Sequence, residues 1–275
     1  MIKDILFFIS VLFVVSMGIV LLSTEASHAI TANKIMELEE SRNDGTTMVG
    51  KMKMILIDKN GNQRKRLLKG FRKDKGKDSL RMMFFIKPSD VKDTGFLTYD
   101  YYEGKKDDDQ WLYLPELRKT KRIASSDKSS AFMGTDFSYA DWTNRTLNEW
   151  TYTLVKEDLV RNKKVWVIEA KPINNSVIDR YGYTKSVFFV QQDIYMIVRA
   201  IHWVVEGKRK KYLDILKVAK IDGIWTDIET HVKTAKNRNI LHQTILKRYD
   251  IKYNQNLNDD IFTIRRLEKG IKSLR

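Results

Sequence analysis

The stretch MVGKMKMILIDKNGNQ, residues 48–63, decides the fold class of this chain. Positions 48, 50, 52, 54 and 56 form one face with three methionines, a glycine and a leucine, and the other face carries Lys51 and Lys53. This period of two is typical of a β-strand with one buried face. Asn60-Gly61 then accepts the positive φ angles of a hairpin turn, so residues 63–73 are predicted to return as the partner strand.

The same alternation repeats along the chain. Further strands are predicted at residues 80–86, 96–102, 111–114, 150–154, 166–170, 183–190, 194–205, 224–234 and 245–253. Hairpin spacing throughout predicts an antiparallel sheet of about eleven strands, and so many strands in one sheet must curl, close or split in two. We therefore expect a mainly β fold, whose curled sheet leaves a concave face that a few helices, a ligand or both must cover.

Composition bounds the domain count and excludes disorder as the main state. The chain has 275 residues, of which 43% are hydrophobic, and this is ample material for a core. No linker rich in Pro or Ser divides it, so residues 30–275 are predicted to form a single domain. Within this domain, residues 30–45 are predicted to form a helix that Thr31 caps and Gly45 ends.

Residues 1–29 have the features of a signal peptide. Lys3 precedes an uncharged apolar run from Ile5 to Leu22, and the small residues Ser27 and Ala29 suit cleavage before Ile30. An uncleaved membrane anchor is the alternative, although the run is at the short end of what spans a bilayer. In both cases the bulk of the chain is expected to leave the cytoplasm.

The net charge of +15 makes an anionic partner plausible. Basic residues concentrate between Arg64 and Lys77, with shorter clusters at residues 118–122 and 208–211. In a cytosolic chain such clusters would indicate nucleic acid, but outside the cytoplasm we expect an anionic membrane surface and no nucleic acid. A solvated strand face is the alternative for each cluster. The predicted membrane-contacting residues are Arg64, Lys65, Arg66, Arg72 and Lys73.

Catalysis has little support in the sequence. The absence of Cys excludes a thiolate metal site and a cysteine nucleophile, and no Gly-rich phosphate loop or Gly-x-Ser-x-Gly motif occurs. His202, His231 and His242 lack the spacing of a zinc-binding helix, and the turn Asp107-Asp108-Asp109 is interpreted as a solvated loop. We expect no enzyme, no metal and no cofactor. A hydrolase would need a serine with a base in reach, which only a structure can reveal.

The most informative stretch runs from Trp111 to Trp142. It contains WLYLP at residues 111–115, a basic strand that carries Arg122, and FMGTDF at residues 132–137. A loop as apolar as the second motif is expected either to plug a core or to form the lip of a ligand cavity.

These residues resemble the LolA-like family of outer-membrane lipoprotein-sorting proteins. They are most similar to a branch whose signature is WLYLP, a basic strand and FMGSDF, followed by Tyr and Asp. Thr135 stands where Ser is usual and keeps the hydroxyl. Residues 87–97 and 259–263 are similar too, so the resemblance spans nearly all of residues 30–267.

The resemblance implies a half-open β-barrel with helices over its mouth. It also implies a periplasmic carrier that holds acyl chains in an apolar cavity and moves lipids or lipoproteins towards the outer membrane. Members of this branch are associated with RND-type exporters, so such an exporter is an expected partner. The alternative function is an inner-membrane-tethered binding module of that exporter, which an uncleaved N-terminal segment would favour.

Methionine-rich strand faces agree with a cavity, because Met repacks around varied apolar cargo, although Met that simply fills a core is the alternative. We expect the concave face to hold the acyl chains and the Phe132–Phe137 loop to border the opening. The predicted ligand-binding residues are Met52, Met54, Met82, Phe84, Trp111, Tyr113, Phe132, Met133 and Phe137.

Overall fold

A computed structural model describes residues 30–102 and 106–274, and the predicted signal peptide lies outside these residues. Thirteen strands of the described part form one antiparallel sheet. They are β1 (Thr47–Asp58), β2 (Gln63–Lys75), β3 (Asp78–Lys87), β4 (Gly95–Asp100), β5 (Asp109–Leu114), β6 (Lys119–Arg122), β7 (Trp150–Val160), β8 (Lys163–Pro172), β9 (Tyr183–Gln191), β10 (Met196–Val204), β11 (Arg209–Ile221), β12 (Ile224–Lys236) and β13 (Asn239–Tyr253).

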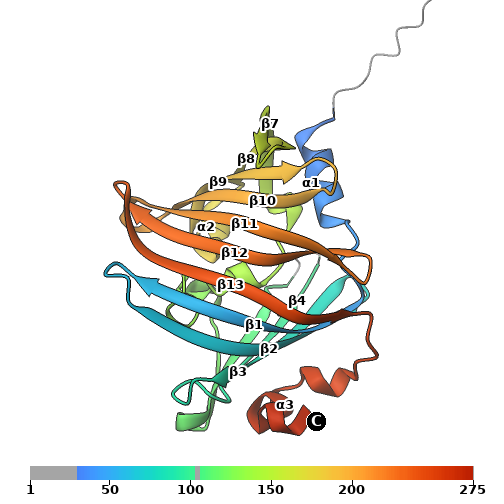
Figure 1. The fold of residues 1–275 in the computed structure, drawn as a ribbon, viewed down its shortest axis with the longest axis vertical. Coiled ribbons are helices and arrows are strands. Elements are labelled where there is room, and N and C mark those ends of the chain that lie inside the picture. The colour runs from blue at the N-terminus through green and yellow to red at the C-terminus, as the bar shows by residue number, and fades with distance from the viewer. Residues whose placement is uncertain (1–29, 103–105, 275) are drawn as a thin grey trace, which may run out of the picture. The chain divides into compact units, whose positions relative to one another are not determined.

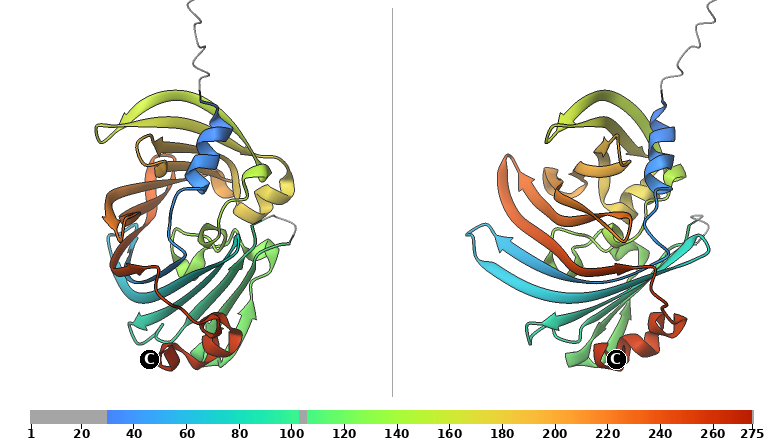
Figure 2. Two further views of the ribbon diagram at one scale, coloured as in Figure 1. Left: turned by 90° about the vertical axis from the view of Figure 1, so that its right-hand side faces the viewer. Right: turned by 45° about the vertical axis from the view of Figure 1, so that its right-hand side comes forward.

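The spatial order of the strands is β6-β5-β4-β3-β2-β1-β13-β12-β11-β10-β9-β8-β7. Every strand therefore pairs with a chain neighbour, and β1 also pairs with β13, which joins the two halves of the sheet. The strands β6 and β7 lie at its two ends, so the sheet curls around an interior without closing (Figures 1 and 2). The predicted curled antiparallel sheet in a half-open arrangement is confirmed.

The strand count exceeds the prediction of about eleven chiefly because β11 was not foreseen. Lys211 shares the inner face of this strand with Leu213 and Ile215, whereas Tyr212 and Leu216 are exposed on the outer face. Polar and apolar residues thus occur on both faces, and no clear period of two appears. The predicted hairpin after β1 is confirmed, since Gly61 has a φ of 84° and the N–H of Asn60 donates to the Asp58 carboxylate.

Three α-helices accompany the sheet within the described residues: α1 (Ala32–Glu40), α2 (Asn175–Tyr181) and α3 (Ile264–Lys269). Thr31 caps α1 as predicted, accepting a hydrogen bond from the N–H of Lys34 at 3.2 Å. The helix ends before the predicted Gly45, because the N–H of Ser41 already closes its last turn. It passes beside β7 at the open side of the sheet, and its residues Ile35 and Met36 are fully buried (Figure 2).

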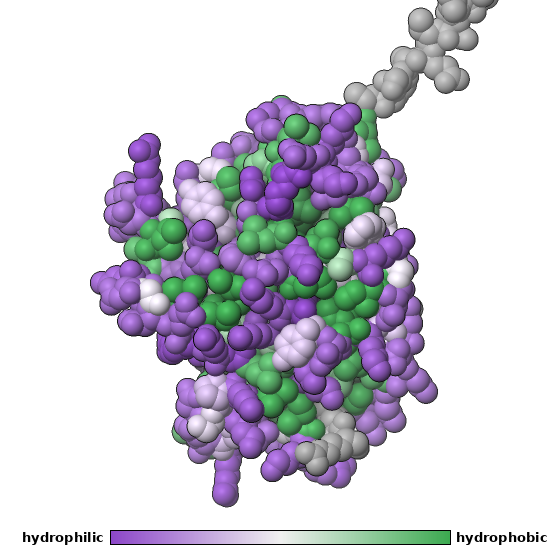
Figure 3. All heavy atoms as spheres, viewed as in Figure 1, coloured by the Kyte–Doolittle hydropathy of each residue, from purple (hydrophilic) through white to green (hydrophobic). Residues whose placement is uncertain are grey.

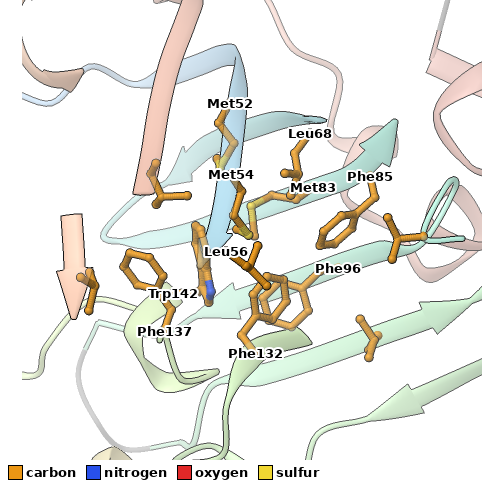
Figure 4. Packing of buried hydrophobic residues seen from close by; sticks show 14 of the residues in the cluster. Met52, Met54, Leu56, Leu68, Met83, Phe85, Phe96, Phe132, Phe137 and Trp142 are labelled. Atoms are coloured by element: carbon orange, nitrogen blue, oxygen red, sulfur yellow. The ribbon is translucent and has the colours of Figure 1, made fainter. Parts of the chain in front are cut away.

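Apolar side chains cover both faces of the sheet around β2–β5. The inner cluster includes Met54, Phe85 and Phe132 (Figure 4), and the outer cluster joins Met82 and Phe84 to the segment that contains α3. Consecutive residues of β3 enter different clusters because side chains alternate across a strand. The outer face shown in Figure 3 is mostly polar, with apolar patches among the charged residues. No helix in the described part is both long and apolar enough for a membrane span.

Candidate ligand-binding interior

Two adjacent cavities lie inside the curled sheet, with volumes of about 350 and 380 Å³. Phe137, Ile197, Leu213 and Ile215 line both, so the cavities are neighbouring parts of one interior. Residues between 39 and 44 also border both, which makes the end of α1 and the segment after it one wall. Both volumes fall in the range of roughly 300–1,000 Å³ that is typical of small-molecule sites.

The lining is more charged than the apolar cavity that was predicted. Six cationic and five acidic side chains border the two cavities. The cations are Arg42, Arg72, Arg81, Arg145, Lys211 and Arg248, and the acids are Glu39, Glu40, Asp44, Asp141 and Asp227. Because a charge removed from bulk water needs a partner, this interior requires polar complementarity as well as apolar contact.

A buried network around Asp141 borders the first cavity. The Asp141 carboxylate accepts hydrogen bonds from the Tyr183 hydroxyl at 2.8 Å and from the N–H of Ser138 at 2.7 Å. Burial opposes the charge on Lys211, but Tyr183 and Asp141 outweigh it and raise the pKa of the lysine. Burial lowers the pKa of His202 to about 3 despite the nearby Asp141, so the imidazole that stacks on Tyr183 is neutral at pH 7.

Ser186 and His202 form the kind of pair that a serine hydrolase would need, with Oγ and Nδ1 2.8 Å apart. Ser186 is fully buried, however, and the Asp141 carboxylate bonds Tyr183 rather than the imidazole. A nucleophile must be reachable by its substrate and its base must be oriented by a third group. The pair is better explained as a core histidine with a satisfied ring nitrogen.

Four arginines line the second cavity, and the three that lie on strands of the sheet each have a carboxylate partner. The pairs are Arg72 with Asp44, Arg81 with Asp100 at 3.5 Å, and Arg248 with Asp227 at 2.9 Å. Arg81 also donates to the carbonyl of Trp142 at 3.0 Å and to the side chain of Asn144 at 2.6 Å. Strands β2, β3 and β13 supply the arginines, so the sheet itself fixes their spacing.

The Phe132–Phe137 loop plugs the end of the interior beside the cavities (Figure 4). Phe132 is fully buried, and its ring centroid lies 4.9 Å from that of Phe96 and 5.3 Å from that of Trp142. Phe137 borders both cavities, and Met133 is partly buried at the edge of the cluster. Of the two predicted alternatives, the core plug describes Phe132, while Phe137 lies where a cavity lip was expected.

Polar contacts fix this loop to the sheet. The buried Asp136 carboxylate accepts hydrogen bonds from Thr234 at 2.6 Å and Thr244 at 2.7 Å, and its other contact is His242 Nδ1 at 2.7 Å. Arg66 on β2 donates to the carbonyl of Met133 at 2.7 Å. The loop is thus tied to β12 and β13 at one side and to β2 at the other.

The predicted ligand-binding residues do not share one face. Met52 lines the second cavity, and Met54 is fully buried in the inner cluster. The placement of four others on the concave face was wrong, because they belong to the outer cluster or pack against it. These four are Met82, Phe84, Trp111 and Tyr113. Residues 82–85 of β3 are all apolar because both faces are covered, so alternation could not show which side faces inward.

The predicted membrane-contacting residues also divide. Arg64 and Lys65 are exposed, as a surface role requires. Arg66 contacts the plug loop, the side chain of Arg72 is only 11% exposed, and Lys73 donates to the carbonyl of Leu257 at 2.7 Å. Arg66 and Arg72 therefore lie on the inner side of β2, which contradicts the prediction for these two, whereas membrane contact by Arg64, Lys65 and Lys73 stays a prediction.

Sequence reasoning missed the charged residues of the interior. The usable signal was an arginine in phase with inward apolar residues, as Arg248 follows Thr244 and Leu246 on β13. For Asp141 and Lys211 we find no comparable local signal, because loop and sheet geometry bring them together.

The acidic turn at residues 107–109 was expected to be a solvated loop, but only Asp107 of its three aspartates is exposed. Asp109 is buried and lies 3.1 Å from Lys106 Nζ, and Asp107 lies 3.4 Å from an Arg180 nitrogen. Cations from neighbouring segments therefore offset the like charges. Across residues 30–102 and 106–274, no cluster of three or more possible ligands suited to a metal ion is found.

Comparison with solved structures places this architecture among LolA-like folds. A DUF1329 family protein from Desulfovibrio piger is 26% identical, with a TM-score of 0.78 over 86% of this chain and 97% of that one. A domain from Vibrio parahaemolyticus that is described as an outer membrane lipoprotein-sorting protein is 25% identical. Its TM-score is 0.77 over 86% of this chain and 98% of that one. A LolA superfamily protein from Nitrosomonas europaea shares the fold at 18% identity and a TM-score of 0.65, over 86% and 100%.

The predicted resemblance to LolA-like lipoprotein-sorting proteins is thereby confirmed at the level of fold and neighbours. More narrowly, a family model described as that of an uncharacterized protein matches residues 77–269, and the chain belongs to this family. No curated protein matches the chain. None of the three similar structures is described as an enzyme.

Proposed function

We propose that this chain is a periplasmic carrier that binds acyl chains of lipids or lipoproteins inside its curled sheet and moves them towards the outer membrane. The observation that carries the proposal is the pair of adjoining cavities beside α1, in a fold shared with a lipoprotein-sorting domain. No enzymatic role is proposed, because the Ser186–His202 pair is buried.

The apolar part of the lining supplies the driving force. Ile197, Leu213 and Ile215 run between the two cavities, and Met52 and Leu246 extend the apolar surface in the second. Burial of a 16-carbon chain at about 0.8 kcal/mol per CH₂ offers roughly 12 kcal/mol before the costs of association and ordering. Appreciable binding is therefore expected of a chain that enters both cavities.

The test is native mass spectrometry of protein purified from the periplasm, followed by lipid extraction. The wild type should carry an acyl-containing ligand. Ile197→Trp should lose most of it, since an indole would occupy space shared by both cavities. Ile245→Trp is the matched control, because Ile245 alternates with the buried Thr244 and Leu246 and lies on the outer face. A ligand-free wild type that also fails to take up fatty acid in vitro would contradict the proposal.

Processing of the N-terminus separates this proposal from its alternative, a module tethered to the inner membrane that serves an RND-type exporter. A free carrier requires cleavage before Ile30. N-terminal sequencing should find Ile30 first, and a chain that keeps residues 1–29 in most molecules would favour the tethered module.

A further inference from the structure

Four residues that line the second cavity each carry a buried hydrogen-bond donor that has no acceptor among the described residues. The donors are the Nε–H groups of Arg81 and Arg248, the hydroxyl of Thr98 and the indole N–H of Trp142. Thr98 is fully buried and Trp142 is 8% exposed. Buried polar groups are nearly always paired in native proteins, so four unpaired donors around one space indicate an acceptor that the chain itself does not supply.

The charges around this space point the same way. Arg72 and Arg81 lie directly opposite each other in the β2–β3 ladder, an arrangement of like charges that is unfavourable without a shared counter-charge. Arg72 pairs with Asp44 and Asp74, Arg81 pairs with Asp100, and Arg248 pairs with Asp227, so no single carboxylate serves both opposed arginines. Of the other acids at this cavity, Asp141 is held by Tyr183 and Ser138, and burial raises the pKa of Glu39.

Apolar residues adjoin the arginines. Met52 on β1 and Leu246 on β13 border the same cavity, and Ile215 continues into the first one. A ligand that suits both parts has an oxygen-rich anionic end and an apolar chain.

We propose that the second cavity binds the anionic head group of an amphiphile, a phosphate or carboxylate, at Arg81, Arg248, Thr98 and Trp142, while its acyl chain lies along Met52, Leu246 and Ile215. The inference rests on the proposed carrier function and names its ligand class. Guanidinium groups suit such oxyanions because several of their N–H donors can contact one anion together.

The test compares ligands that share one chain and differ in the head. The assay measures displacement of a fluorescent fatty acid from the full delipidated protein. The competing ligands are palmitoyl lysophosphatidic acid, palmitate, palmitoyl lysophosphatidylcholine and monopalmitin. Glycerol phosphate, which has the head group without the acyl chain, is the control. Lysophosphatidic acid and palmitate should bind at least tenfold more tightly than monopalmitin, since hydrogen bonds to charged groups are the stronger ones.

Two variants address the head site. Thr98→Val removes an unpaired buried hydroxyl, so it should fold normally and reduce the preference for the anionic ligands severalfold. Arg248→Gln should reduce it about tenfold. Arg199→Gln is the matched control, because Arg199 also pairs with an aspartate, Asp214, and both border a groove away from the two cavities. Monopalmitin binding should be unchanged in Arg199→Gln, and in the other two variants it should change less than the binding of the anionic ligands.

The outcomes separate the two proposals. Equal affinity for anionic and neutral ligands, or an unchanged preference in Thr98→Val and Arg248→Gln, would overturn the head-group site and leave the carrier intact. Glycerol phosphate that binds as tightly as lysophosphatidic acid would identify a small-anion site and overturn the amphiphile. Failure of every acylated ligand to bind would instead overturn the carrier function.

Discussion

The carboxylate of Asp136 is buried and meets three side chains, from Thr234, His242 and Thr244, while its backbone N–H donates to the Thr244 hydroxyl at 3.0 Å. A single residue therefore ties the plug loop to two neighbouring strands. No local pattern indicates this role, because the strands that complete the contact lie about a hundred positions further along the chain.

Asp136→Ala should destabilise the protein by about 3 kcal/mol or more, since it leaves the buried Thr244 hydroxyl, the partly buried Thr234 hydroxyl and His242 without their acceptor. Urea unfolding measures the change. Thr135→Ser is the control from the same loop. It keeps the hydroxyl that donates to the carbonyl of Phe132 at 2.8 Å and should cost at most about 1 kcal/mol. Similar losses of stability in the two variants would show that the contacts of the Asp136 carboxylate do not stabilise the fold.

Asp108 gives the stability a defined pH dependence. Burial, and after it the neighbouring Asp100, raises the pKa of Asp108 to about 6, whereas in the unfolded chain the carboxyl titrates near pH 4. The native state therefore binds this proton more tightly. The protonated Asp108 therefore adds to the free energy of unfolding. This contribution is fully present below about pH 4 and is lost as the pH rises through 6.

Asp108→Asn should consequently stabilise the protein by about 2 kcal/mol at pH 7.5 and leave it unchanged at pH 4. The amide keeps an oxygen for the N–H of Tyr101, which donates to Asp108 at 2.9 Å. Asp107→Asn is the control with the opposite sign, because the Ser125 hydroxyl lowers the pKa of Asp107, and its removal should destabilise near neutrality. Denaturant unfolding midpoints at the two pH values measure the change in stability. An equal gain in stability at pH 4 and pH 7.5 would contradict the raised pKa of Asp108.

At the scale of elements, sequence patterns predicted what is decided locally. The β1–β2 hairpin follows from Asn60-Gly61 and from alternation in residues 48–56, and α1 follows from its Thr31 cap. The sequence patterns failed where the orientation of a strand depends on the segment that packs against it. Strand β3 is apolar on both sides because the segment that contains α3 covers its outer face, and the two sides could not be told apart before that cover was known.

The contact between α3 and β4 should be measurable as an energetic coupling. A Cβ added at Gly95 would lie 2.5 Å from Leu267 Cδ1 and 3.1 Å from Phe84 Cε1. Gly95→Ala should therefore cost about 2 kcal/mol, and Leu267→Ala, at a fully buried position, about 3 kcal/mol. In the double variant the cost of Gly95→Ala should fall below about 1 kcal/mol, because the obstructing methyl is gone. Strict additivity in urea unfolding would mean that α3 does not press on β4.

At the scale of the whole molecule, the antiparallel curl was predictable and the contents of its interior were not. Hairpin after hairpin forces an antiparallel sheet, and many strands force it to curl. The charges that line the cavities depend on which residues of distant strands meet, as Arg72 of β2, Arg81 of β3 and Arg248 of β13 do. Only Arg72 stands in a basic stretch, that of residues 64–77, whereas Arg81 and Arg248 are in phase with inward apolar residues of their strands.

One end of the molecule has the features expected of a membrane-contacting surface. Strand β1 pairs with β13 as far as Asp58 opposite His242, so the β1–β2 and β12–β13 hairpins end side by side (Figure 1). Arg64 and Lys65 are exposed on the first hairpin, and Ile240 and Leu241 are 50% and 37% exposed on the second. Exposed cations beside exposed aliphatic side chains suit the headgroup region of an anionic bilayer.

Reversing the charges of Arg64 and Lys65 to Glu should therefore weaken binding to vesicles that contain anionic lipid by at least tenfold at low salt, since each basic residue near such a surface contributes about 1 kcal/mol. The effect should shrink as salt rises, because exposed charges are screened within about 10 Å at 0.1 M. Reversal of Lys163 and Lys164, exposed at the start of β8, makes the same change in net charge elsewhere. Vesicle sedimentation distinguishes the two. Equal losses of vesicle binding in both variants would mean that net charge alone accounts for the attraction to the membrane. Wild-type binding that does not depend on salt or on lipid charge would contradict a membrane contact by Arg64 and Lys65.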